Sequence, residues 1–133
     1  MVEMTVESTR SVMDRYWTGD HDDVNVLAPD VVFRMMATGE EYRTPQGVSE
    51  GLQNFYRGAF EATAEMRRVI IDAGSAVFEG DVVGRHTVEF AGVPATGRDV
   101  RIPLVVVYDV RDDAISEARV YSEVPVFLAQ VTG

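Results

Sequence analysis

The pattern of apolar and polar residues along 82–110 predicts two long strands joined by a turn rich in Gly, Pro and Thr, and in the first strand the two kinds of residue alternate. In the first strand, one face carries Val82, Gly84, His86, Val88 and Phe90, and we expect this face to point inward. His86 is then the polar member of an otherwise apolar face. Such a histidine either lines a pocket or is a satisfied core residue, and the spacing alone leaves both interpretations open.

The rest of the chain predicts helices first and strands afterwards. Apolar residues at helical spacing predict a helix over residues 4–17, and a longer amphipathic helix that Thr44 and Pro45 open and that runs to residue 60. The other predicted elements are a short helix over 22–28, a strand over 31–36, a loop up to 43, strands over 66–72, 76–79 and 114–122, and a short helix or strand over 124–131. This order indicates an α+β fold, in which a curved sheet wraps around the early helices.

The composition of the 133 residues, 46% of them hydrophobic, is typical of a single folded domain. The chain has no cysteine, which excludes a disulfide framework and a thiolate metal site. Its net charge of −10 disfavours binding to nucleic acid and to anionic membranes. Because no apolar run approaches the length of a membrane span, we expect a soluble, cytoplasmic protein.

Residues 86–98, HTVEFAGVPATGR, resemble the H-x-G-E-F-x-G-x-P-P-T-G-K/R segment of SnoaL-like polyketide cyclases, a family of the NTF2-like superfamily. Val88 replaces a frequent glycine of this segment, and Ala95 replaces its second proline. Residues 27–33 and 115–123 are similar to two further segments of the family. The resemblance implies a single SnoaL-like domain over residues 1–133 with the NTF2-like cone, a strongly curved antiparallel sheet wrapped around N-terminal helices.

The resemblance also implies two catalytic candidates, His86 and Tyr16. In SnoaL-like cyclases a pocket histidine at this motif position takes part in the site, and a neutral imidazole can act as a general base. Tyr16 stands where related cyclases and ketosteroid isomerases have a pocket tyrosine, whose hydroxyl can polarise a carbonyl or enolate. A Tyr-Trp pair at the inner edge of a helix is equally consistent with plain core packing.

Large residues on the inward faces, and one acid at a strand end near the mouth of the cone, are expected to contact the ligand. The predicted ligand-binding residues are Trp17, Phe33, Met36, Phe55, Val88, Phe90, Val106 and Glu123. No carboxylate is expected inside the cone. Residues 34–36 occupy the place of the ketosteroid isomerase base, Val105 or Val106 occupies that of its oxyanion aspartate, and Glu89 is expected to point outward.

The acidic run at residues 20–23 lacks the spacing of a preformed metal site and is better explained as the start of a helix. The sequence also carries no phosphate-binding or dinucleotide-binding motif. We therefore expect neither a metal nor a cofactor.

Two main functions remain open. In the first, the protein is a cyclase, isomerase or related hydrolase that applies acid–base chemistry to a small hydrophobic carbonyl or polyketide-like compound. In the second, it is a binding module that holds such a compound without converting it. The motif favours the enzyme, and the missing internal carboxylate favours the binder. A third possibility, a partner-binding protein of the NTF2 type, requires an exposed apolar patch.

A homodimer through the outer face of the sheet is also predicted. If the alternating residues 102, 104, 106 and 108 point inward, then Pro103, Val105 and Val107 point outward, together with Val83 of the neighbouring strand. A second copy of the chain would cover this apolar patch.

Overall fold

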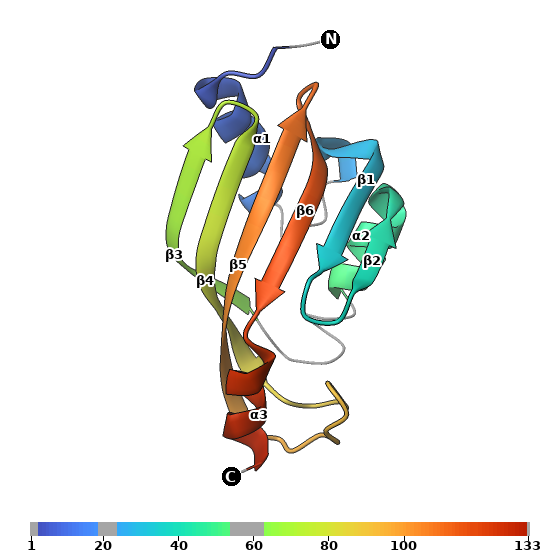
Figure 1. The fold of residues 1–133 in the computed structure, drawn as a ribbon, viewed down its shortest axis with the longest axis vertical. Coiled ribbons are helices and arrows are strands. Elements are labelled where there is room, and N and C mark those ends of the chain that lie inside the picture. Colours follow the sequence, from blue (N-terminus) through green and yellow to red (C-terminus); the bar gives the residue numbers. More distant parts are fainter. Residues whose placement is uncertain (1–2, 19–23, 54–62, 133) are drawn as a thin grey trace.

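The computed structural model describes residues 3–18, 24–53 and 63–132, which are organised around one six-stranded sheet (Figure 1). Its strand order is β2-β1-β6-β5-β4-β3. The strands are β1 (Leu27–Met35), β2 (Glu40–Arg43), β3 (Thr63–Asp72), β4 (Ser75–Arg85), β5 (Asp99–Arg111) and β6 (Ala114–Ser122). The sheet is mixed and not wholly antiparallel as predicted, since β1 runs parallel to β6 while the other neighbouring pairs are antiparallel.

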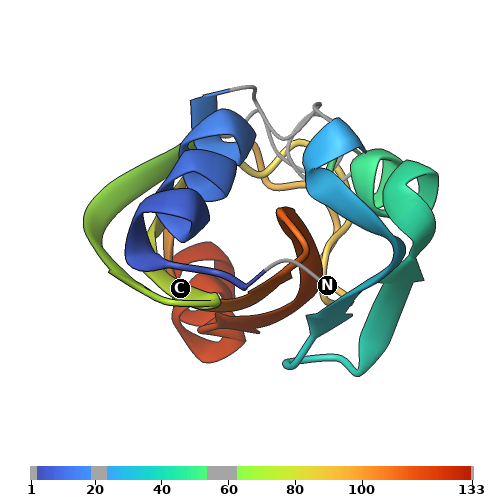
Figure 2. The same cartoon turned by 90° about the horizontal axis from the view of Figure 1, so that it is seen from above.

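The helices cover one face and one end of this sheet. They are α1 (Val6–Thr18), the 3-10 turn η1 (Val24–Val26), α2 (Thr44–Gln53) and α3 (Val124–Thr132). Helix α1 packs against β3 and β4, α2 packs against β1 and β2, and α3 packs against β5. Seen from above, the sheet bends into a trough with α1 and α2 over its two arms (Figure 2). The α+β architecture predicted from the sequence is thus confirmed.

Side-chain caps fix where α1 and α2 begin. The backbone N–H of Ser8 donates to the Thr5 hydroxyl, and that of Gly47 donates to the Thr44 hydroxyl, each at 3.1 Å. Each bond satisfies one of the N–H groups that a helix start leaves without an intrahelical partner. Pro45 lies at the first turn of α2, as predicted, where its missing N–H costs nothing.

Alternation along β4 and β5 separates an inner from an outer face. The buried inner residues are Ala76, Phe78 and Val82 of β4, and Val100, Ile102, Leu104, Val106, Tyr108 and Val110 of β5. They form the core together with residues of α1, α2, α3 and β1. The outward-facing residues of β5 between them are less buried, which matches the prediction for this strand pair.

Three local elements differ from prediction. Residues 40–43 form β2 instead of a loop, and the strand expected at 31–36 already begins at Leu27. The short helix expected over 22–28 is only η1, while residues 22 and 23 lie outside the described residues. The amphipathic helix is described as far as Gln53, so its predicted continuation to residue 60 is not described. None of the helices in the described ranges is long and apolar enough to span a membrane.

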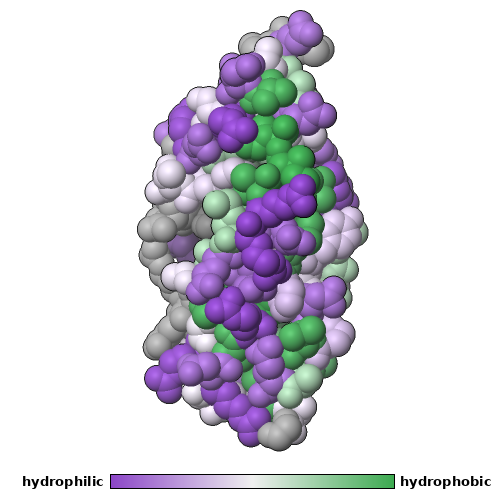
Figure 3. Space-filling view, turned by 90° about the vertical axis from the view of Figure 1, so that its left-hand side faces the viewer, coloured by the Kyte–Doolittle hydropathy of each residue, from purple (hydrophilic) through white to green (hydrophobic). Residues whose placement is uncertain are grey.

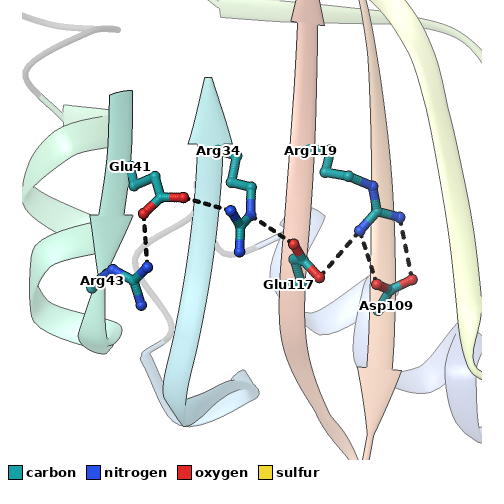
Figure 4. Close-up of polar contacts among 6 residues, drawn as sticks. All are labelled: Arg34, Glu41, Arg43, Asp109, Glu117 and Arg119. Carbon is teal, nitrogen blue, oxygen red and sulfur yellow. Dashed lines mark hydrogen bonds and ion pairs between the residues drawn. The ribbon is translucent and has the colours of Figure 1, made fainter. Parts of the chain in front are cut away.

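One row of ion pairs crosses the outer face from β2 to β5 (Figure 4). Arg34 bridges Glu41 at 2.5 Å and Glu117 at 2.8 Å, and Arg119 bridges Glu117 at 3.3 Å and Asp109 at 2.9 Å. The hydrogen bond from Arg43 holds the pKa of Glu41 below its ordinary value. This row keeps the arginines of β1 and β2 on the outer face of the sheet.

A second charged group lies on the outer face at β3, β4 and β5. The Asp81 carboxylate is buried between Arg67, at 2.6 Å, and Arg101, at 2.8 Å. Burial acts to raise the pKa of Asp81, but the hydrogen bonds from the two arginines outweigh it and lower the pKa. The two charged groups therefore lie on either side of the apolar middle of the outer face.

Candidate functional site

A cavity of about 400 Å³ lies on the concave side of the sheet. Its apolar walls come mainly from the inner faces of four strands and from α2, and include Phe33, Leu52, Val82, Ile102, Leu104, Val106 and Val120. Its polar lining residues, among those described, are Tyr16, Thr38, Glu40, Tyr42, Glu89, Tyr108 and Ser122. The size and the mainly apolar lining with a few polar groups are typical of a small-molecule site.

Three aromatic rings meet at the buried part of the cavity. The ring centroid of Tyr16 lies 6.2 Å from that of Phe33 and 5.9 Å from that of Tyr108, and the last two are 6.4 Å apart. Each of the three residues is almost fully buried. Their mutual edge and tilted contacts hold the rings in place, so this wall is rigid and ready to receive an apolar group.

The strand β2 brings a tyrosine and a carboxylate to the cavity. Because side chains alternate along a strand, Glu40 and Tyr42 lie on the inner face, while Glu41 and Arg43 lie on the outer one. The Tyr42 hydroxyl donates a hydrogen bond to Oε2 of Glu40 at 3.1 Å. Burial raises the pKa of Tyr42, and the bond to Glu40 raises it further, so the phenol stays protonated at neutral pH.

A tight hairpin after β4 supplies a further wall. Phe90 and Val93 exchange two backbone hydrogen bonds, of 3.0 Å and 2.9 Å, across a turn formed by Ala91 and Gly92. Both turn residues have positive φ, 51° and 80°, which is the geometry of a type I′ turn. Residues 89–92 of this hairpin line the cavity, so Glu89 is a second acidic residue of its lining.

The base of the same hairpin is held by His86. Its backbone pairs with Arg98 and Gly97, and Nδ1 lies 3.1 Å from the Thr96 hydroxyl. The imidazole is fully buried and packs edge-on against Phe127 of α3, at 5.0 Å between ring centroids. The same Phe127 ring packs against Phe90 at 5.2 Å. His86 is thus joined to the cavity wall through α3 and Phe90.

The predicted site residues divide into two groups. Tyr16, Phe33, Phe90 and Val106 line the cavity. His86, Trp17, Met36, Val88 and Glu123 are not among the described residues that line it, and Phe55 lies outside the described residues.

The described residues of the second group have other places in the fold. Trp17 packs against Phe78 and Tyr108, with ring centroids 6.1 Å and 6.0 Å apart. Met36 and Val88 are exposed, at 44% and 49%. Glu123 is exposed at the start of α3, where its carbonyl accepts the N–H of Val126 at 3.0 Å.

No carboxylate was expected inside the cone. Two acidic residues that were not predicted as site residues, Glu40 and Glu89, are among those that line the cavity, and both are exposed to solvent. The sequence holds a weak signal for Glu40, since the four residues EEYR alternate with a period of two, with the aromatic ring and one acid on the same face. Among the described residues no group of three or more metal-binding side chains forms a site, and the acidic run at 20–23 lies outside them.

Comparison with known proteins shows the family of the chain. The family model described as SnoaL-like polyketide cyclase matches residues 4–131. No curated protein sequence matches the chain. Among solved structures, a protein from Silicibacter sp. TM1040 that is named as a polyketide cyclase is 17% identical, with a TM-score of 0.81 over 98% of this chain and 99% of that one.

Two further structures are similar. IdmH from Streptomyces antibioticus, named as a polyketide cyclase, is 25% identical, with a TM-score of 0.70 over 96% of this chain and 97% of that one. A protein from Kribbella flavida named as a ketosteroid isomerase is 19% identical, with a TM-score of 0.68 over 88% of this chain and 78% of that one. The fold is therefore NTF2-like, and by the match over residues 4–131 the chain belongs to the SnoaL-like polyketide cyclase family.

Proposed function

We propose that this protein binds a small hydrophobic carbonyl or polyketide-like compound in the cavity and promotes proton transfer next to its carbonyl group, as a cyclase or isomerase without a cofactor. The observation that carries the proposal is the pair formed by Tyr42 and Glu40 on the wall of a mainly apolar cavity. Family membership agrees with it, because polyketide cyclases act on carbonyl compounds.

The two side chains have complementary roles in this chemistry. The Glu40 carboxylate accepts the proton from the carbon next to the carbonyl, and the electron pair of that C–H bond moves into an enolate. In the structure, the Tyr42 hydroxyl donates a hydrogen bond to Glu40. In the proposed reaction it reorients and donates to the enolate oxygen, where negative charge develops. A raised pKa suits this role, since it keeps the phenol proton in place as a donor. Tyr16 adds a second hydroxyl at the buried end.

His86 acts in this proposal as a positioning residue. Its bonds at the base of the hairpin and its contact with Phe127 support the placement of Phe90 and Glu89 on the cavity wall. The general-base role that the family resemblance implied for His86 remains a prediction, and the substitutions described in the Discussion distinguish the two roles.

Binding without conversion is the second candidate function. Glu40 and Glu89 are both exposed to solvent, whereas enolising enzymes commonly use a carboxylate that is shielded from water. A binding module needs only the apolar walls and the polar groups that orient its ligand.

One experiment separates the two functions. We expect the protein to bind 2-tetralone, an aromatic ketone, and to accelerate exchange of its α-hydrogens with D₂O, followed by NMR. Glu40→Gln should reduce the acceleration by about 100-fold or more, because a positioned general base contributes roughly that much. Glu41→Gln, one residue along on the outer face, is the matched control and should leave the rate unchanged. Binding measured by calorimetry without accelerated exchange would establish the binding module instead.

We also propose a homodimer through the outer face of the sheet. Val105 and Val107 lie at its middle, flanked by Ile70 and Tyr121, which are 49% and 46% exposed. Figure 3 views the molecule from the side of β3, along the edge of the sheet, and shows there a band of hydrophobic residues that hydrophilic ones border and interrupt. The charged groups beside the patch are already paired within one chain, as Arg101 is with Asp81, so they can stay at a solvated rim.

The dimer is tested by placing charge at the middle of the patch. We expect the unmodified protein to sediment at twice the mass of one chain at micromolar concentration. Val105→Asp combined with Val107→Asp should yield a folded monomer, because burying two unpaired carboxylates would cost more free energy than the interface contributes. A dimer that survives both substitutions would show that the interface lies elsewhere, and a monomeric parent protein would refute it.

A further inference from the structure

Among the residues that the structure describes, the charged residues that line the cavity are all acidic. Glu40 on β2 and Glu89 on the hairpin both line the cavity, and no arginine, lysine or histidine of the described ranges does so. Both carboxylates are exposed, whereas the aromatic wall is buried, so the acids lie towards the mouth and the rings lie at depth. The cavity therefore has an apolar end and an anionic end.

Among the described residues, the arginines near this mouth have partners elsewhere. Arg34 and Arg43 project from the outer face of β1 and β2 and pair with Glu41, as Figure 4 shows. At the hairpin, Arg85 donates to the Gly97 carbonyl at 3.3 Å, and Arg98 donates to the Gln130 carbonyl at 3.1 Å. On β2, strand alternation places Glu40 towards the cavity and Arg43 away from it.

We propose that the ligand of this cavity carries a protonated amine at the end that lies at the mouth, next to Glu89, with its apolar body against Tyr16, Phe33 and Tyr108. This inference rests on the proposed function and narrows its ligand class to hydrophobic cations. The carbonyl group then lies between these two ends, within reach of Tyr42 and Glu40 on β2.

The physical argument is electrostatic. A cleft lined by charges of one sign, with low-dielectric walls, focuses the field and concentrates ligands of the opposite sign. A ligand carboxylate at the same place would meet two like charges and lose hydration without gaining a partner. The formal net charge of −10 adds to the preference. Aromatic faces also attract ammonium groups, so even a deeply placed amine would be tolerated by this lining.

Three probes of equal carbon number and different charge test the inference. They are 2-(2-naphthyl)ethylamine, 2-(2-naphthyl)ethanol and 2-naphthylacetate, each titrated into the full-length protein by calorimetry at neutral pH. We expect the amine to bind about tenfold or more tighter than the carboxylate, which corresponds to about 1.4 kcal/mol, with the alcohol between them. Added NaCl should weaken binding of the amine and leave the affinity for the alcohol unchanged.

Substitutions identify the residues that cause the preference for the amine over the carboxylate. Glu89→Gln should remove most of the difference between amine and carboxylate while leaving the affinity for the alcohol unchanged, and Glu40→Gln should reduce the difference further. Glu41→Gln, whose carboxylate pairs with Arg34 and Arg43 on the outer face, is the control and should preserve the difference. The melting temperature of each variant is recorded so that unfolding is not mistaken for lost binding.

The outcomes separate this inference from the proposed function. Equal binding of all three probes, or tighter binding of the carboxylate, overturns the cationic ligand and leaves the cavity as a ligand site. A preference for the amine that survives Glu89→Gln combined with Glu40→Gln also overturns it, because the selectivity then comes from other groups. Failure of all three probes and of 2-tetralone to bind overturns both proposals.

Discussion

Replacing Gly80 with alanine is expected to destabilise the fold by about 3–5 kcal/mol, because the added methyl group has no room. A Cβ at this position would lie 2.1 Å from the carbonyl oxygen of Glu65 and 2.9 Å from Cε1 of Phe78. The Glu65 oxygen belongs to β3, beside the register shift between Met66 and Arg68, where the two strands approach closely. A backbone oxygen cannot turn away as a side chain can, so β3 must separate from β4 locally.

A second glycine provides the control. A Cβ on Gly47 in α2 would meet only the Thr44 hydroxyl, at 3.4 Å, which is an ordinary contact. Gly47→Ala should therefore be neutral or stabilise the protein by about 0.5–1 kcal/mol through helix propensity. Urea unfolding followed by circular dichroism measures both variants. A free energy of unfolding for Gly80→Ala within about 1 kcal/mol of the parent value would contradict the close approach of β3 to β4.

The faces of β4 and β5 can be predicted from the sequence because the two strands are long, regular and paired in continuous register. Along β5, Ile102, Leu104, Val106 and Tyr108 are buried, and the residues between them are less so. In a strand of this kind one observation, the period of two, fixes the direction of every side chain. The inner wall of the cavity follows from that single pattern.

The same rule fails just beyond the end of β4. The strand ends at Arg85, and the chain then turns through the hairpin, so the alternation does not continue to residue 90. Val88, predicted to point inward, is 49% exposed, and Glu89, predicted to point outward, lines the cavity. Residues 87–89 lie between β4 and the Phe90–Val93 bridge and include a bend at Val88, and the period of two holds only along an extended strand.

The placement of Glu40 and Tyr42 depends on contacts that β2 makes with β1 and α2. Tyr42 pairs with Phe33 across the sheet, and its ring packs against α2 where residue 51 is glycine. A Cβ on Gly51 would lie 2.7 Å from Cδ2 of Tyr42, so the missing side chain makes the space that the ring occupies. A strand of four residues gives too few positions for alternation to be recognised against a polar loop.

Replacing His86 with alanine is expected to lower the free energy of unfolding by about 2–4 kcal/mol, since it leaves a cavity in a packed region. The imidazole is fully buried, contacts Phe127 and lies within hydrogen-bonding distance of Thr96. Because the hairpin that His86 holds carries Phe90 and Glu89, binding of 2-tetralone should weaken as well. Thermal and urea unfolding measure the first effect, and calorimetry measures the second.

His86→Phe is the substitution that decides between positioning and catalysis. Phenylalanine retains an aromatic ring, slightly larger than imidazole, that can pack edge-on against Phe127, and it loses the bond to Thr96. We expect this substitution to cost about 1 kcal/mol. A positioning role predicts that this variant binds 2-tetralone and exchanges its α-hydrogens nearly as fast as the parent protein. A variant that is stable and binds normally but no longer exchanges would assign the proton transfer to His86. In that case the bound state would have to bring the imidazole to the cavity, past the ring of Phe90 that now packs on Phe127.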